Sequence, residues 1–88
     1  MTEILFDKIS RLLELSVQTP NGDAQRGQLN LTSIYREDDD FILQGMGVLS
    51  GREHHFPLSR ILEIIDVETS ENVDIDEFRR ELLDHMRA

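Results

Sequence analysis

Residues 13–31 read LELSVQTPNGDAQRGQLNL, and the prediction of the fold starts from this stretch. Apolar and polar residues alternate on both sides of its centre, which is the period of a half-buried strand. The centre, Pro20-Asn21-Gly22-Asp23, is a strong turn sequence because proline presets φ and Asn-Gly adopts positive φ at little energetic cost. The stretch therefore predicts a β-hairpin. The alternating apolar residues are Leu13, Leu15 and Val17 before the turn and Leu29 and Leu31 after it.

Three further strands are predicted downstream of this hairpin. Residues 41–46 and 61–67 are apolar at positions of both parities, so each strand is expected to be buried on both faces. Residues 52–58 alternate, and Pro57 lacks an amide donor, so this strand is expected at an edge of the sheet. The acidic stretch Glu37-Asp38-Asp39-Asp40 interrupts the apolar pattern and is interpreted as a solvated loop.

Helices are expected on both sides of the strands. Residues 2–10 carry a capping threonine and apolar residues at helical spacing, which predicts a short N-terminal helix. Asp74 followed by Glu77 resembles a capping box, and residues 74–87 carry one apolar stripe, which predicts an amphipathic C-terminal helix. This helix is expected to dock on the outer side of the third and fifth strands. Its stripe consists of Ile75, Phe78, Leu82 and Met86.

Together these elements predict one domain over residues 1–88, mainly β with flanking helices, in the α+β class. Residues 12–67 are expected to form either a small, strongly bent five-stranded antiparallel sheet or an SH3/Sm-like barrel. The periodicity supports strands better than it supports closure of a barrel. An open meander packed on the C-terminal helix is therefore the structural alternative.

The composition excludes several functional classes. The chain has 9 basic and 18 acidic residues and a formal net charge of −9, which would repel a nucleic acid bound mainly through its phosphates. It has no cysteine, so disulfides, thiolate zinc sites and cysteine nucleophiles are excluded. The sequence shows neither a membrane-length apolar run nor a signal-peptide pattern. No membrane association is expected, and the expected compartment is the cytoplasm.

Residues 54–61, His-His-Phe-Pro-Leu-Ser-Arg-Ile, contain a basic residue, an aromatic, a leucine and an Arg-Ile pair in that order. This motif is similar to the terminal motif of the WYL domain, and the order of elements from about Ile4 to Asp66 resembles that family as well. The resemblance implies a bacterial SH3/Sm-like barrel of the kind attached to transcriptional regulators and defence proteins. It also implies a nucleotide or nucleic acid as regulatory ligand.

The chain departs from this family at three places. Phe41-Ile42-Leu43 stand where the family has Trp-Tyr-Leu, and Leu31 stands where it has a proline. His54 takes the place of an arginine. Arginine can hold a phosphate through two hydrogen bonds and stays charged, whereas neutral histidine does neither. The resemblance therefore supports the fold better than the ligand.

Arg52, His54 and Arg60 form the candidate ligand-binding site. Strand parity puts Arg52 and His54 on one side, and Arg60 lies where the strand meets the next turn. All three would then border one mouth of a barrel, where they could hold a small anionic ligand such as a nucleotide. In the alternative interpretation, Arg60 anchors the turn through carbonyls or an ion pair with Glu63, and Arg52 is solvated.

The other candidate sites have simpler interpretations. His54 and His55 are adjacent on a strand and point to opposite faces, so they cannot readily share a metal ion. Residues 38–40 lack the ligand spacing of an EF-hand loop, and His85 is isolated on the C-terminal helix. The sequence shows no nucleophile elbow and no glycine-rich phosphate loop. No enzyme activity, cofactor or bound metal is expected.

The predicted function is a non-enzymatic interaction or regulatory module that acts through protein–protein contacts. Its exposed sheet edge or its C-terminal helix would engage a protein partner or a second copy of the chain as a homodimer. The alternative is a WYL-like sensor that binds a small anionic ligand such as a nucleotide at Arg52, His54 and Arg60.

Overall fold

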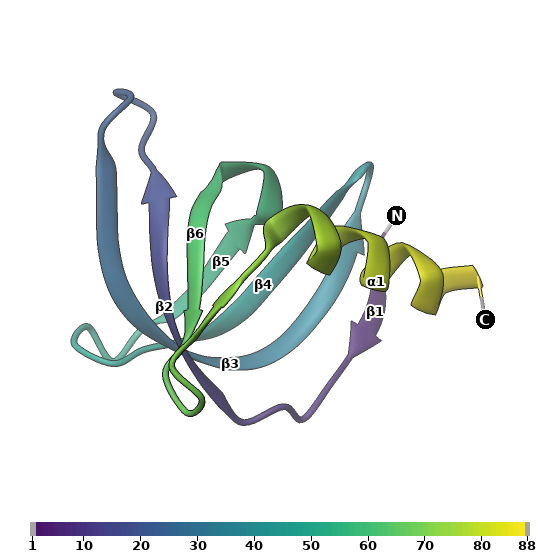
Figure 1. Cartoon of the computed structure of the whole chain (residues 1–88), viewed down its shortest axis with the longest axis horizontal. Helices are drawn as coiled ribbons and strands as arrows, with labels where there is room; N and C mark the ends of the chain where they lie inside the picture. The colour runs from purple at the N-terminus through teal and green to yellow at the C-terminus, as the bar shows by residue number, and fades with distance from the viewer. Residues whose placement is uncertain (1, 88) are drawn as a thin grey trace.

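The computed structural model describes residues 2–87, which form seven antiparallel strands and one α-helix (Figure 1). A 3₁₀ turn, η1 (Leu58–Arg60), and a helix, α1 (Ile75–Arg87), accompany the sheet. The strands are β1 (Thr2–Phe6), β2 (Arg11–Gln18), β3 (Ala24–Glu37), β4 (Asp40–Gly47), β5 (Glu53–Pro57), β6 (Ile61–Asp66) and β7 (Glu71–Val73).

The sheet is open and strongly bent. Its strand order is β5-β4-β3-β2-β6-β7, with β1 paired to β3. β3 curves through the molecule, so that its first half pairs with β2 and its second half with β1 (Figure 1). β5 and β7 end this path, β1 pairs with β3 alone, and the sheet that residues 2–87 form is not closed into a barrel. The prediction of a bent antiparallel sheet with a C-terminal helix is confirmed, whereas the barrel alternative is wrong.

The predicted helix over residues 2–10 is wrong, because residues 2–6 form β1. Long-range pairing overrides the helical spacing: the second half of β3 extends past β2 and offers an unpaired edge, which β1 occupies with Ile4 opposite Tyr35. Lys8 then adopts φ of 56°, a conformation incompatible with a continuing helix. A short strand that was not expected, β7, pairs with β6 just before the C-terminal helix.

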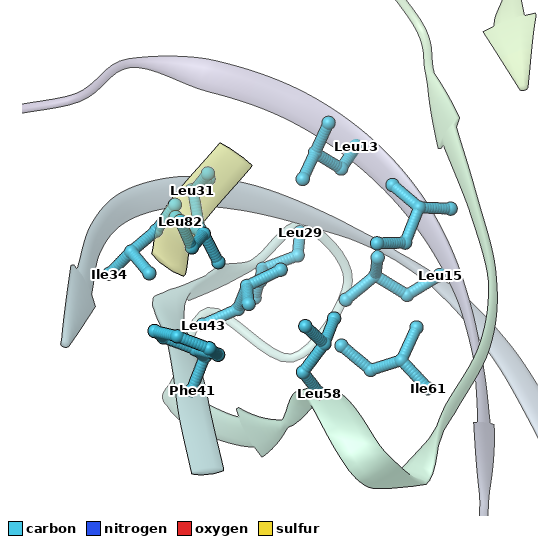
Figure 2. Close-up of a cluster of buried hydrophobic side chains, with 11 residues drawn as sticks. Leu13, Leu15, Leu29, Leu31, Ile34, Phe41, Leu43, Leu58, Ile61 and Leu82 are labelled. Carbon is cyan, nitrogen blue, oxygen red and sulfur yellow. The ribbon is translucent and has the colours of Figure 1, made fainter. Parts of the chain in front are cut away.

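The hydrophobic core lies on the inner face of the bend, and α1 packs on that same face. Leu82 is 2% exposed and belongs to the same buried cluster as the leucines of β2 and β3 (Figure 2). The expectation that the helix would cover the outer side of the sheet is therefore wrong. The buried cluster consists of Leu13, Leu15, Leu29, Leu31, Ile34, Phe41, Leu43, Leu58, Ile61, Ile64 and Leu82.

A β-bulge explains why β6 is apolar at positions of both parities. The register between β2 and β6 shifts between Ser16 and Val17, which leaves Leu62 as an extra residue. Ile61 and Ile64 both reach the core because of this shift, whereas Leu62 is 53% exposed. The prediction that β6 is covered on both faces is therefore wrong at Leu62. For β4 the same prediction is confirmed at Phe41, Ile42 and Leu43, which are all buried, and is wrong at Met46, which is 41% exposed.

A second bulge divides β3 into its two halves. The register between β3 and β4 shifts between Leu31 and Ser33, which makes Thr32 the extra residue. Pairing with β2 ends at Leu31, and pairing with β1 starts at Ile34. The carbonyl of Thr32 accepts a hydrogen bond of 2.8 Å from the amide of Ile9. Leu31 and Ile34 therefore both face the core, although they are three residues apart and a regular strand would bring every second residue to one face.

An ion pair joins the start of β2 to the end of β6. Asp66 is only 8% exposed, and its carboxylate accepts hydrogen bonds from Arg11 Nε at 2.7 Å and from the amide of Glu68 at 3.0 Å. The hydrogen bond from Arg11 holds the pKa of Asp66 below its usual value, against the opposing effect of burial. The charged form of Asp66 therefore stabilises the folded state.

Candidate functional site

A groove of about 420 Å³ lies at the open end of the bent sheet, where Leu15 and Leu29 of the buried cluster line it and no described residue of α1 does. It runs between the first half of β3 and β5, and the turn between β4 and β5 forms part of its wall. Of the described residues that line it, none is an aspartate or glutamate, although the chain carries 18 acidic residues. Its apolar lining includes Leu15, Val17, Leu29, Val48, Leu49 and Phe56.

Two unpaired strand edges border this groove. β5 ends the sheet, so one of its edges has no neighbouring strand. β3 pairs with β4 only from Leu29 onward, so residues 24–27 have a neighbour on the β2 side alone. Such edges offer backbone N–H and C=O groups to an added strand. The groove therefore combines an apolar surface with two sets of main-chain hydrogen-bonding groups.

The backbone of β5 is oriented by its pairing with β4. The amide of Gly47 donates to the carbonyl of Arg52 at 2.8 Å, which fixes the phase of the antiparallel ladder. Hydrogen-bonded and non-hydrogen-bonded pairs then alternate, so His54 and Phe56 turn their backbone groups toward β4 and His55 turns its own outward. Pro57 contributes no amide donor, which agrees with its predicted place on an edge strand.

Gly27 leaves an open space in the wall of the groove. It lies opposite Leu15 in the register of β2 and β3, and a Cβ built on it would meet no heavy atom within 4 Å. Its φ is not positive, so neither backbone strain nor a close approach requires glycine here. Glycine inside a strand is destabilising by about 0.5–1 kcal/mol relative to alanine. The local effect of Gly27 is to keep the groove open.

The opposite wall is a stack of rings held in place by the β4–β5 turn. The rings of His54 and Phe56 lie 5.5 Å apart with an interplanar angle of 12°. His54 Nε2 and Ser50 Oγ form a hydrogen bond of 2.9 Å. A Cβ on Gly47 would lie 2.9 Å from the His54 ring, so only glycine leaves room for this stack. The wall is therefore fixed by packing as well as by hydrogen bonding.

The groove brings together two of the three predicted ligand-binding residues. His54 and Arg60 line it, from β5 and η1 respectively. Arg52 does not line it: this residue lies in the β4–β5 turn with an exposed side chain, and its amide donates to Ser50 Oγ at 3.2 Å. Strand parity could not predict that Arg52 lies outside the groove, because parity applies within a strand and Arg52 precedes the first paired residue of β5.

The turn after β5 is anchored by Asp40 instead of by Arg60. Asp40 accepts hydrogen bonds from Ser59 Oγ at 2.6 Å and from the amide of Ser59 at 3.4 Å. Glu63, the acid suggested as a partner for Arg60, lies 3.5 Å from Arg26. Within residues 2–87, the guanidinium of Arg60 has no ion pair and no hydrogen bond. Arg60 is therefore an exposed, uncompensated positive charge on the groove.

The acidic stretch at residues 37–40 was expected to be a loop, but only Asp38 and Asp39 form the turn, because Glu37 of β3 pairs with Asp40 of β4. Asp38 adopts φ of 55° there, and the Asp40 carboxylate also accepts a bond of 2.9 Å from the amide of Phe41. No group of three or more candidate metal ligands occurs within the described part of the chain. His85 is exposed, as expected for a residue on the helix surface, but its ring stacks on Phe6 at 4.4 Å.

A polar cluster on the outer face was not predicted from the sequence. Tyr35 Oη and His55 Nδ1 form a hydrogen bond of 2.9 Å, and His55 Nε2 lies 3.5 Å from Glu53. Gln44 bonds Glu53 and also accepts from Ser33 Oγ at 3.1 Å. Burial and then the charges of acidic neighbours raise the pKa of Tyr35, which disfavours its phenolate as a nucleophile. The cluster ties β3, β4 and β5 together, and the ring of His55 bonds to it while the ring of His54 bonds to Ser50, although both histidines line the groove.

The last two findings concern membrane-spanning helices and similarity to known proteins. In the part of the chain from residue 2 to residue 87, no helix has both the length and the apolar character needed to cross a membrane. Comparison with protein-family models, with curated proteins and with solved structures finds no match for the chain.

Proposed function

We propose that this chain is a non-enzymatic interaction module that binds an extended segment of another protein in the groove between β3 and β5. The observation that carries the proposal is the coincidence of an apolar groove with two unpaired strand edges. An extended peptide needs main-chain partners for affinity and side-chain pockets for specificity, and this groove offers both. Such recognition requires no catalytic residue.

The proposed fold family is an open variant of the SH3/Sm-like barrel, related to the WYL module. Support comes from five consecutive strands, β2 to β6, in which the last strand pairs with the first. A single 3₁₀ turn, η1, separates the last two of these strands. In this proposal, the gap left by incomplete closure between β3 and β5 is the binding site.

A sensor for a small anionic ligand is the second candidate function. His54 and Arg60 both line the groove, and Arg60 has no partner in the described part of the chain. An arginine of this kind can hold a phosphate or carboxylate through two parallel hydrogen bonds. The groove is mainly apolar, however, and Arg52 lies outside it, so one arginine would have to carry most of the charge recognition.

Selection of displayed random peptides against the whole chain, followed by NMR titration of ¹⁵N-labelled chain, tests the proposal. A selected peptide should shift the amide signals of groove residues such as Leu15, Gly27 and Phe56, and should leave α1 unchanged. Enrichment of peptides that perturb only α1, or the absence of any enrichment, would contradict it. Shifts at His54 and Arg60 caused by a nucleotide panel alone would favour the second candidate.

A further inference from the structure

The space at Gly27 is the most specific feature of the groove. Its neighbours across the register belong to the core face: Leu15 lies opposite, and Leu29 lies two residues along the same face of β3. Phe56 is only half-buried and lines the same groove. A side chain supplied from outside would therefore find apolar atoms around it at a position where the chain itself supplies none.

The charge of the groove is opposite to that of the whole chain. The chain has a net charge of −9, yet the described lining holds arginine and histidine and no acidic residue. Arg26 is compensated, since its guanidinium lies 3.5 Å from both Glu14 and Glu63. Arg60 is not compensated within residues 2–87. A carboxylate placed beside Arg60 would gain a charge-assisted hydrogen bond without displacing an existing one.

From these observations we infer the chemistry of the partner, an inference that rests on the proposed function. The partner is an extended segment of another protein that places a large apolar side chain in the space at Gly27 and a carboxylate beside Arg60. The segment adds along an unpaired edge of the groove, in the manner of strand augmentation. Its acidic content is low, because the net charge of the chain repels a polyacidic ligand.

Blocked heptapeptides that alternate threonine with apolar residues are the probes for this inference. One carries phenylalanine near its centre and glutamate two residues later, so that both side chains lie on one face of the extended peptide. A second replaces the glutamate by glutamine, and a third replaces the phenylalanine by alanine. Fluorescence anisotropy of labelled peptides gives the Kd for the whole chain. We expect each replacement to weaken binding by about tenfold, because each removes one of the two inferred contacts.

Two pairs of matched variants assign these contacts to residues. Gly27→Val should fill the space and weaken binding of the phenylalanine–glutamate peptide by about tenfold or more, whereas Asn30→Val, an exposed position on the opposite face of the same strand, should not. Arg60→Gln should remove the preference for glutamate over glutamine, whereas Arg52→Gln, outside the groove, should keep it. Gly27→Ala serves as a smaller change if the valine variant fails to fold.

The outcomes separate this inference from the proposed function. If a peptide binds in the groove and its Kd is unchanged by Gly27→Val, Gly27→Ala and Arg60→Gln, the inferred partner is wrong and the proposed interaction module is not contradicted. Failure of every peptide, selected or designed, to bind would overturn both. Concentration-dependent dimerisation in sedimentation that Gly27→Val abolishes would assign the groove to a second copy of the chain, which also overturns the inference.

Discussion

The two halves of β3 meet very different surroundings, although they belong to one continuous strand. Residues 24–28 are all exposed, while Leu29, Leu31 and Ile34 in the second half are buried. The first half has β2 as its neighbour, whereas the second half has strands on both sides and Leu82 of α1 in the same cluster. Burial along β3 is therefore decided by what packs beside it and less by its own alternation of residues.

The contrast assigns different roles to the two ends of the sheet. The helix-covered end contains the buried Leu82, and the Arg11–Asp66 ion pair joins β2 to β6 outside the groove, so these regions are expected to carry most of the stability. The open end contains a strand glycine, two unpaired edges and an uncompensated arginine. Surfaces that bind partners are commonly drawn from the less stable parts of a structure. Four substitutions test this division, in order of decreasing effect.

Leu82→Ala should destabilise the protein most. The side chain is 2% exposed in the main cluster, and truncation of a buried leucine typically costs about 2–5 kcal/mol through lost burial and a residual cavity. Urea denaturation followed by circular dichroism measures the change. Leu83→Ala, at a side chain 36% exposed on the same helix, is the control and should cost much less. Equal losses in the two variants would mean that α1 does not close this end.

Gly45→Ala should be the next most destabilising change. The matched substitution at the other strand glycine, Gly27→Ala, is the comparison. A Cβ on Gly45 would collide with the carbonyl oxygen of Asn30, and overpacking of this kind costs about 1–3 kcal/mol. Gly27→Ala meets no atom and should be neutral or stabilising. Thermal denaturation of the two variants checks the difference. A loss of stability in Gly27→Ala as large as in Gly45→Ala would show that the space at Gly27 is already filled.

Asp66→Asn should reduce the dependence of stability on pH. Because the folded-state pKa of Asp66 is lowered, its contribution is complete above the unfolded-state value of about 3.9 and is lost as the pH falls toward the folded-state value. Urea midpoints measured from about pH 6 down to about pH 3 should fall less steeply for the variant than for the wild type. Asp23→Asn, in the exposed hairpin turn, is the control. Parallel curves for Asp66→Asn and wild type would contradict the stabilising role of the ion pair.

Leu49→Ser should have the smallest effect on folding. Leu49 is 98% exposed at the tip of the β4–β5 turn, and surface substitutions of this kind usually change stability by less than about 0.5 kcal/mol. A differential scanning fluorimetry measurement should show an unchanged melting temperature. A clear decrease would mean that Leu49 packs against the groove in the free protein, which would then be closed in the absence of a partner.

Much of the sheet could be predicted from local pattern, because alternation and turn sequences act over a few residues. The hairpin around Pro20-Asn21-Gly22, the edge strand at Pro57 and the C-terminal helix all follow from such signals. β1 could not be predicted, since residues 2–6 are extended only because β3 offers them an edge. The exposure of Leu62 depends on the bulge in β6, which no local pattern indicates.

The candidate site was partly predictable for the same reason. His54 and Arg60 were found through a motif and a turn, and both line the groove. Gly27 was not recognised, because an isolated glycine in a strand usually indicates a bulge or a close approach of another chain segment. Only the surroundings of Gly27 show that neither is present and that the space is empty.

The bulge at Thr32 affects the curvature of β3 but does not decide which of its residues face the core. Without Thr32, Ser33 would follow Leu31 directly, and Ile34 would still face inward in a regular ladder. The bend and extra twist that a bulge introduces would be lost, however. The curvature of β3 therefore depends in part on a residue that does not line the groove. A one-residue deletion at this position would alter the curvature of β3 while leaving the residues that line the groove unchanged.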